Sequence, residues 1–252
     1  MPMQGKNADL ISFMATYFAE LDDPGFVWPR LTGAALALPQ LRAYWPFTSA
    51  DENGNVYDVS GQGRTLTNNN AATFGTSDLR VYATTNGTDE DFSRADEAGL
   101  EFAGAMTALG WWYFSRASGT EEVMLSKAGA LGGSGWYLAR GTTNDLKFRI
   151  NATTNVTANN VVAQDTWVHC AVRFTPSTEM AIFANGEKTT FTSSIPASIT
   201  GNALAFSVNS ALASGTARYF QGNVCQIVLC GAAVSDVLIW SHFQQTRGIF
   251  GV

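Results

Sequence analysis

The sequence predicts an all-β protein: an antiparallel two-sheet sandwich with a helical arm at its N-terminus and a short helix at its C-terminus. Charged residues make up only 14% of the 252 residues, below the ~25% typical of soluble domains. The polar share comes instead from Thr, Ser, Asn and Gly, which favour strands and turns. From Leu41 onward, short apolar segments alternate with turn signals. Sandwiches of this length fold as single units.

The first predicted element is a helix over residues 7–22. Asn7 is a suitable N-cap, and Asp9 lies in the first turn, where the helix dipole favours a carboxylate. Its apolar stripe consists of Leu10, Ile11, Phe13, Met14, Tyr17, Phe18 and Leu21. Asp22-Asp23-Pro24-Gly25 ends the helix.

Residues 24–40 form a connector in which three prolines prevent long regular structure. It also carries apolar anchors such as Trp28. We therefore expect residues 1–40 to form an arm, distinct from a sandwich over 41–252, that binds another protein or a symmetry mate. The alternative is that the arm helix folds back over one sheet of its own domain.

Residues 166–174 give the clearest strand, because apolar side chains alternate along it. Asn185-Gly186 predicts a two-residue hairpin turn between strands at 179–184 and 187–191. Further strands are predicted at 110–116, 122–127, 135–140, 145–150, 203–208 and 217–230. Ser235 is the expected N-cap of a helix over 236–247, which Gly248 closes.

Composition excludes several classes of partner and site. A net charge of −6, with no run of Lys or Arg, argues against nucleic acid. No segment reaches the ~18 apolar residues of a membrane span, and the N-terminus does not resemble a signal peptide. We therefore expect synthesis in a host cytoplasm. Cys170, Cys225 and Cys230 are expected to be buried free thiols.

Several segments, in order, resemble the laminin-G-like jelly rolls of the concanavalin A-like lectin and glucanase superfamily. They are Ala43-Tyr44-Trp45-Pro46-Phe47, Tyr57–Gly63, Leu100-Glu101-Phe102, Trp111–Phe114, Trp167–Ala171, Ile182–Gly186 and Gly222–Ile227 with Val234-Ser235. The resemblance implies a jelly-roll sandwich and, in some relatives, calcium and sugar binding. Two carboxylates of the family pattern are replaced, by Asn185 in the hairpin and by Cys225 in the closing strand.

The sequence offers candidates for two kinds of ligand site, one for calcium and one for sugars. Asp51, Glu52, Asn53, Asn55 and Asp58 supply hard oxygen donors around Gly54 and are the candidate calcium ligands. The alternative is a polar turn that binds no metal, and no other cofactor is expected. Among the aromatic residues, Trp112, Trp136 and Tyr137 are the candidates for stacking on sugars, with core packing as the alternative. Trp111 and Trp112 must point to opposite faces of one strand.

No catalytic residue is expected. Glycoside hydrolysis needs two carboxylates facing one cleft, and no predicted strand offers acids at i, i+2 or i+4. Asp89-Glu90-Asp91 falls in a stretch that resembles a loop. The two histidines, His169 and His242, are accounted for by the strand pattern and the terminal helix.

The sequence favours a non-enzymatic structural or attachment protein of a virus particle, such as a bacteriophage capsid decoration or tail-associated protein located in the virion. A sandwich of this family usually works outside the cell, yet no export signal is present, and the apolar arm suits docking on other virion proteins. The alternative is a lectin module that binds cell-surface glycans. A glycoside hydrolase is the third hypothesis.

Overall fold

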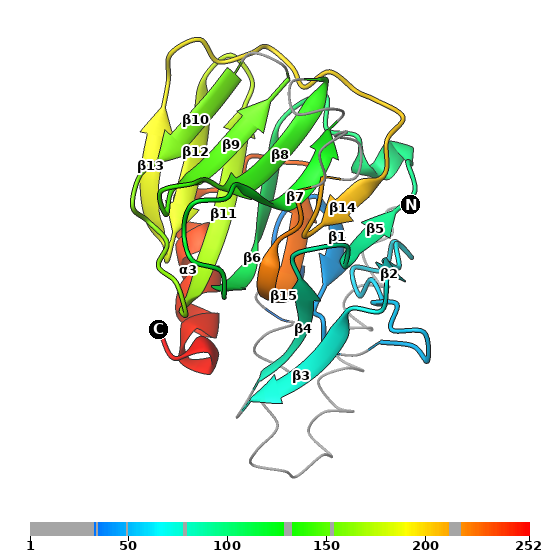
Figure 1. Ribbon diagram of the computed structural model, residues 1–252. Coiled ribbons are helices and arrows are strands. Elements are labelled where there is room, and N and C mark those ends of the chain that lie inside the picture. Colours follow the sequence, from blue (N-terminus) through cyan, green and yellow to red (C-terminus); the bar gives the residue numbers. More distant parts are fainter. Residues whose placement is uncertain are drawn as a thin grey trace.

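Figure 1 shows a computed structural model of the protein, which describes residues 33, 35–48, 50–77, 80–128, 133–151, 154–211 and 218–252. In this part of the chain, two antiparallel sheets pack face to face and a helix lies near the C-terminus. The predicted all-β sandwich with a short C-terminal helix is thus confirmed. The helix predicted over 7–22 lies outside the described residues.

The larger sheet has eight strands, in the order β13-β12-β11-β6-β15-β4-β3, with β1 also paired to β15. Its strands are β1 (Leu41–Trp45), β3 (Thr73–Ser77), β4 (Arg80–Asn86), β6 (Met106–Phe114), β11 (Trp167–Thr175), β12 (Glu179–Ala184), β13 (Glu187–Phe191) and β15 (Gln221–Cys230).

The smaller sheet has seven strands, in the order β10-β9-β8-β7-β14-β5-β2. They are β2 (Thr67–Asn69), β5 (Asp91–Arg94), β7 (Glu122–Ala128), β8 (Gly135–Arg140), β9 (Leu146–Ile150), β10 (Thr154–Ala158) and β14 (Phe206–Val208). A 3-10 turn, η1 (Ala98–Leu100), follows β5. Strands 179–184, 187–191 and 135–140 lie where the sequence predicts them, whereas the sequence singled out no strand at β1 to β5 or at β10.

Strand β15 changes partners along its length. It pairs with β6 on one side, while on the other Gln221–Val224 pairs with β4 and 227–230 pairs with β1. The change occurs at a β-bulge, where Gln226 has a φ of 57°. The bulge adds one residue to β15 relative to β6, so the inward-facing positions change from even numbers, as at Val224, to odd numbers, as at Ile227 and Leu229.

The core between the sheets is rich in stacked aromatic rings. Trp45 and Phe206 stack with centroids 5.3 Å apart, and Trp136 lies 6.2 Å from Phe206. The indole nitrogens of Trp45 and Trp112 donate to Arg64 O and Asn209 Oδ1. These bonds satisfy polar groups that would be costly to bury unpaired.

The outer face of the larger sheet is covered by helix α3 (Asp236–Phe250), which lies next to β11 and β12 (Figure 1). As predicted, Trp111 and Trp112 point to opposite faces: Trp112 lies between the sheets and Trp111 lies under α3. The Trp111 ring stacks on Phe250 at 4.1 Å. In β6 and β11, at the centre of this sheet, both faces are therefore largely apolar and buried.

Helix α3 begins as predicted but ends later. The Ser235 side chain accepts a hydrogen bond from Leu238 N, as an N-cap should. The predicted end at Gly248 is wrong, because the helix continues to Phe250 and Gly251, with a φ of 70°, caps it. An interior glycine costs about 1 kcal/mol, and burial of Ile249 and Phe250 offsets that cost.

The end of the connector also lies on this outer face. Ala35 and Leu38 are buried in one cluster with Tyr44 and Val234. The last residues of the predicted arm thus pack against the sandwich. The three cysteines are buried and free, as expected.

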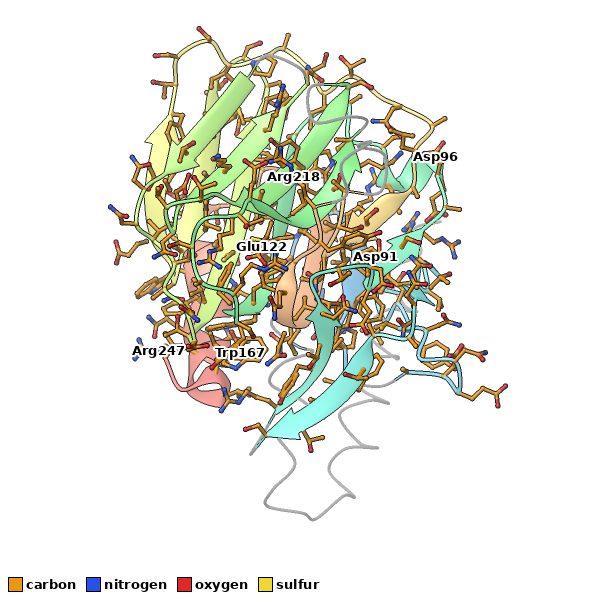
Figure 2. The ribbon with its side chains drawn as sticks, viewed as in Figure 1. Asp91, Asp96, Glu122, Trp167, Arg218 and Arg247 are labelled. Atoms are coloured by element: carbon orange, nitrogen blue, oxygen red, sulfur yellow. The ribbon has the colours of Figure 1, made fainter. Side chains whose placement is uncertain are left out.

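One acidic residue has a different setting from the one predicted. Asp91 begins β5 and is fully buried, whereas the sequence placed it in a loop (Figure 2). Its carboxylate accepts hydrogen bonds from Ser210 Oγ and Asn69 Nδ2. Burial raises the pKa of Asp91 above its ordinary value.

The two histidines join α3 to the sheet. His169 Nε2 on β11 and His242 Nδ1 on α3 lie 3.1 Å apart, and both side chains are fully buried. A hydrogen bond between two imidazole nitrogens needs one donor and one acceptor, so at least one of the two rings must be neutral. Burial lowers the pKa of His242 to about 4, and burial together with the neighbouring His242 lowers the pKa of His169 well below its usual range.

This pair predicts acid-sensitive docking of α3. Below pH ~6.5 the unfolded chain protonates both histidines while the folded protein leaves them neutral, so stability falls as the pH drops toward 4. His242 alone accounts for a loss of about 3 kcal/mol across this range. We expect a double His169→Leu, His242→Leu variant to lose correspondingly less stability, measured by urea unfolding at pH 7 and pH 4.5. Equal losses in both proteins would show that the imidazoles do not control the pH response.

Candidate functional site

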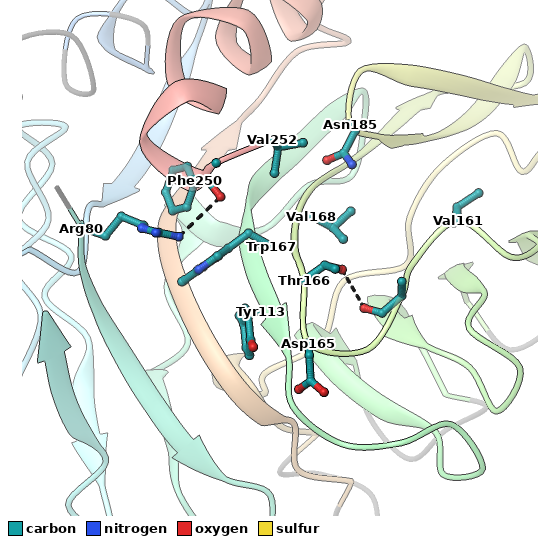
Figure 3. Close-up of a pocket in the computed structure, with 12 residues that line it drawn as sticks. Arg80, Tyr113, Val161, Asp165, Thr166, Trp167, Val168, Asn185, Phe250 and Val252 are labelled. Atoms are coloured by element: carbon teal, nitrogen blue, oxygen red, sulfur yellow. Dashed lines mark hydrogen bonds between the residues drawn. The ribbon is translucent and has the colours of Figure 1, made fainter. Parts of the chain in front are cut away.

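A groove of about 660 Å³ opens where the C-terminal end of α3 meets the first residues of β11 (Figure 3). Tyr113, Trp167 and Phe250 contribute aromatic rings to its wall. Arg80, Asp165, Thr166 and Asn185 contribute polar groups. Figure 3 shows that these side chains belong to β4, β6, the start of β11 and the residues just before it, the β12–β13 turn and the end of α3.

Strand pairing sets the aromatic part of the groove. Trp167 and Tyr113 are directly paired across β11 and β6, so both side chains project from the outer face. The Trp167 ring lies 5.8 Å from Tyr113, 4.9 Å from Phe250 and 5.7 Å from Tyr82. Trp167 itself is 7% exposed, whereas Tyr113 is half-buried. Tyr113 is thus the ring that offers more of its surface to a ligand.

Backbone hydrogen bonds hold the polar part in place. Asn185 lies in the predicted hairpin turn, where its N donates to His169 O and its Oδ1 accepts from His169 N. Asp165 adopts a φ of 57°, and its backbone N donates to Phe114 O. Arg80 Nη1 donates to Phe250 O at 3.4 Å, which links β4 to the end of α3. The groove is therefore largely preformed.

Aromatic surface flanked by a few polar groups is typical of small-molecule binding sites. The half-exposed ring of Tyr113, backed by the buried ring of Trp167, suits the apolar face of a sugar, and Asp165, Thr166 and Asn185 suit its hydroxyl groups. Asp165 contributes the one carboxylate side chain among the groove-lining residues that the structure describes. A glycosidase mechanism needs a pair of such groups.

The three predicted sugar-stacking residues lie elsewhere. Trp112, Trp136 and Tyr137 are at most 4% exposed. Trp112 and Trp136 belong to the core between the sheets, as the alternative of core packing expects, and Tyr137 packs with Val123 and Ala139. Their rings are covered by protein, so they form no exposed platform. Tyr113 was not among the predicted sugar-stacking residues. Its position two residues after Trp111 in one strand nevertheless places both side chains on the same face.

The candidate calcium ligands form two separate turns. Asp51 accepts hydrogen bonds from the backbone N of Asn53 and Asn55 and from Asn55 Nδ2. The Asn55 bonds hold the pKa of Asp51 below its ordinary value. Asp58 accepts from the backbone N of Tyr44, Ser60 and Arg64. Glu52 is exposed.

These carboxylates therefore act as backbone caps in the structure. Among the residues that the structure describes, no three His, Cys, Asp or Glu side chains lie close enough together to hold a metal ion. The predicted arm residues Leu10, Phe13, Met14, Tyr17, Phe18, Leu21 and Trp28 lie outside the described residues. No helix in the described ranges is long and apolar enough to cross a membrane.

A laminin-G family model, described as the concanavalin A-like lectin/glucanases superfamily, matches residues 86–239. The chain belongs to this superfamily. The match runs from the end of β4 to the first turn of α3 and so includes most of both sheets. The resemblance in the sequence is thereby confirmed. No curated protein matches the chain by sequence.

Solved structures share the fold at low sequence identity. The binding domain of Paraclostridial Mosquitocidal Protein 1 is 11% identical with a TM-score of 0.63; the match covers 81% of this chain and 52% of that one. The binding domain of botulinum neurotoxin DC in complex with rat synaptotagmin II is 11% identical with a TM-score of 0.60. That match covers 81% of this chain and 51% of the toxin domain. The same toxin domain in complex with SialylT is 11% identical with a TM-score of 0.59, and the match covers 81% of this chain and 51% of that one. The chain thus spans about half the length of these structures, and it shares its fold with part of these binding domains.

The turn geometry generates a prediction about Asp58. Replacing Asp58 with Ala leaves three backbone N–H groups without their acceptor, which we expect to cost about 2 kcal/mol of stability. Glu52→Ala, an exposed neighbour, should cost almost nothing. Urea unfolding measures both.

Because the carboxylates serve as caps, adding calcium or a chelator should leave the wild-type melting temperature unchanged. A chelator-induced drop of several degrees would reveal a calcium site.

Proposed function

We propose that this protein is a non-enzymatic recognition domain that binds a glycan on a surface through the groove between β11 and α3. The observation that carries the proposal is the placement of Tyr113 and Trp167, two paired aromatic residues, beside the polar side chains of Asp165 and Asn185. A rigid, amphipathic wall of this kind recognises a ligand with apolar faces and hydroxyl edges.

The relatives support a binding role. The similar solved structures are binding domains of clostridial toxins, and two are complexes, one with rat synaptotagmin II and one with SialylT. At 11% identity they show the fold, and function has to be argued from the site.

The contacts of three carboxylates, which are buried or partly buried, support a non-enzymatic role. Asp91 is bonded to Ser210 and Asn69, and Glu122 is paired with Arg140. Asp58 caps backbone N–H groups. A general acid has to face a substrate, whereas these three groups face protein partners.

The test is binding to an immobilised panel of glycans. We expect at least one glycan to bind, and Tyr113→Ala to weaken that binding at least tenfold, about 1.4 kcal/mol, by removing the half-buried ring. The matched control is Tyr57→Ala, which removes a tyrosine that is 47% exposed and does not line the groove.

Two results would contradict the proposal. The first is glycan binding that Tyr113→Ala and Asp165→Ala both leave unchanged, which would move the site away from the groove. The second is turnover of a polysaccharide that a single Asp or Glu substitution abolishes, which would make the protein a glycosidase.

A second role, compatible with the first, is attachment to a virus particle through the N-terminal arm. It is favoured by the seven large apolar side chains between Leu10 and Leu21. Burial of Ala35 and Leu38 fixes the end of the connector on the sandwich, so an attached arm would hold the domain at a defined place.

This role predicts that the full-length protein sediments with particles from its native source. A double Phe13→Ser, Phe18→Ser variant should lose co-sedimentation while keeping its fold by circular dichroism. Val237→Ser, at a position 70% exposed on α3, is the matched control and should co-sediment like the wild type. Recovery of the native protein in the soluble fraction alone would argue against a particle component.

A further inference from the structure

A second pocket, of about 400 Å³, lies away from the groove, where the loop after β6 approaches the turn between β8 and β9. Two arginines, Arg116 and Arg218, line it together with Thr120, Thr142 and Tyr219. Figure 2 shows Arg218 and Glu122 well separated from Trp167 and from Arg247 on α3. The pocket is thus a separate site, and the fold does not need it to close its core.

Two adjacent carboxylates organise the cations around this pocket. Glu121 pairs with Arg218 and with Lys147 Nζ. Glu122 pairs with Arg140 Nη1 at 3.1 Å and with Arg116 Nε at 3.3 Å. These ion pairs link four cationic side chains to two carboxylates. Within this set of six side chains the positive charges exceed the negative ones by two, and Glu121 itself lines the pocket.

Nearby acidic groups are engaged in bonds of their own. Asp145 accepts from Thr143 N and Oγ1 within its turn, and Asp89 accepts from Asn86 Nδ2. Asp91 is buried against Ser210 and Asn69. They reduce the positive potential of the pocket without lining it, and Glu121 reduces it from the lining itself.

A buried network fixes the orientation of Arg116. Arg140 and Glu122 are both fully buried, and Arg140 Nη1 also donates to Arg116 O at 2.6 Å. Gln221 N donates to Glu122 Oε1, and Gln221 Oε1 accepts from Arg116 Nε. Burying an ion pair often stabilises a fold less than an apolar pair does. The network is therefore better explained by what it positions than by stability alone.

The arginines keep donors for a ligand. Arg116 uses Nε and Nη2 in the described bonds, the latter to Gly87 O, which leaves Nη1. Arg218 uses Nη1 on Glu121, which leaves Nε and Nη2. The two side chains are 27% and 34% exposed. A guanidinium group matches the planar geometry of a carboxylate.

From this arrangement we infer that the pocket binds an acidic sugar, a ring bearing one carboxylate and several hydroxyl groups. Arg116 and Arg218 receive the carboxylate. Thr120, Thr142 and Tyr219 supply hydroxyl groups that both donate and accept hydrogen bonds. The volume falls in the range of small-ligand sites and suits one sugar ring. The pocket and the glycan groove are lined by different residues, so each site can be tested without the other.

The test is an NMR titration of the full-length protein with glucuronic acid and, in parallel, with glucose. We expect glucuronic acid to shift the Thr120, Thr142 and Arg218 resonances saturably, and glucose to bind at least tenfold more weakly. Arg218→Gln should weaken glucuronate binding at least tenfold. The matched control is Arg247→Gln, which removes an exposed arginine from α3 and should have no effect. Raising the salt concentration should weaken binding in the wild type.

Three further measurements distinguish an acidic-sugar site from a general anion site and from the groove. Thr142→Val removes a hydroxyl group at an exposed position, where the fold tolerates substitution, and it should also weaken binding. Tyr113→Ala should leave glucuronate binding intact, so failure of the groove proposal leaves this one standing. Inorganic sulfate binding as tightly as glucuronate would show an unselective anion site and overturn the inference. So would equal affinity for glucose, or binding that Arg218→Gln does not change.

Discussion

Strand alternation in β6 imposes the main constraint on this structure. Trp111 and Trp112 are consecutive and must point to opposite faces of the larger sheet, and both are large apolar rings. A sandwich of two sheets covers only the face that carries Trp112. The other face needs its own cover, which α3 and the end of the connector provide. Burying a ring of this size contributes up to ~3 kcal/mol, so the cover is part of the fold.

Both proposed sites lie where a layer of the structure ends. The groove begins where α3 stops at Phe250, because the aromatic face continues beyond the helix to Tyr113. The arginine pocket lies at the ends of strands, where the loops around Glu121 and Thr142 meet. The rigid strands supply the positions and the loops supply the chemistry, which is how sandwich folds commonly carry function.

Local features of the fold were predictable from the sequence, because short-range chemistry determines them. Asn185-Gly186 adopts the conformation that a tight hairpin requires, and Ser235 caps α3. The end of α3 was not predictable in this way. A glycine at position 248 favours termination locally, but Phe250 packs on Trp111 from a distant strand. Tertiary burial outweighed the local preference.

The sites were harder to predict than the fold, because exposure depends on what packs against a strand. Tyr137 and Tyr113 both occupy strands next to a buried tryptophan, yet Tyr137 is covered and Tyr113 is half-exposed beside the groove. Alternation gives the face of each ring, and only the position of α3 shows which face stays open. Likewise, Glu121 and Glu122 are adjacent in the sequence, but most of their ion-pair partners are distant from them along the chain. Their four cationic partners come from the loop after β6, from β8, from β9 and from residue 218.

The charges around the two proposed sites favour different ligands. A chain with a net charge of −6 repels acidic ligands at long range, so an acidic sugar can be recognised only where fixed cations prevail locally. Glu122 contacts both Arg116 and Arg140, and the Glu122–Arg140 ion pair is fully buried, where it is screened far less than at the surface. In the groove beside α3, Arg80 and Asp165 bring one charged side chain of each sign to the wall. A neutral glycan suits that groove, and a domain with both sites would distinguish glycans by the presence of a carboxylate.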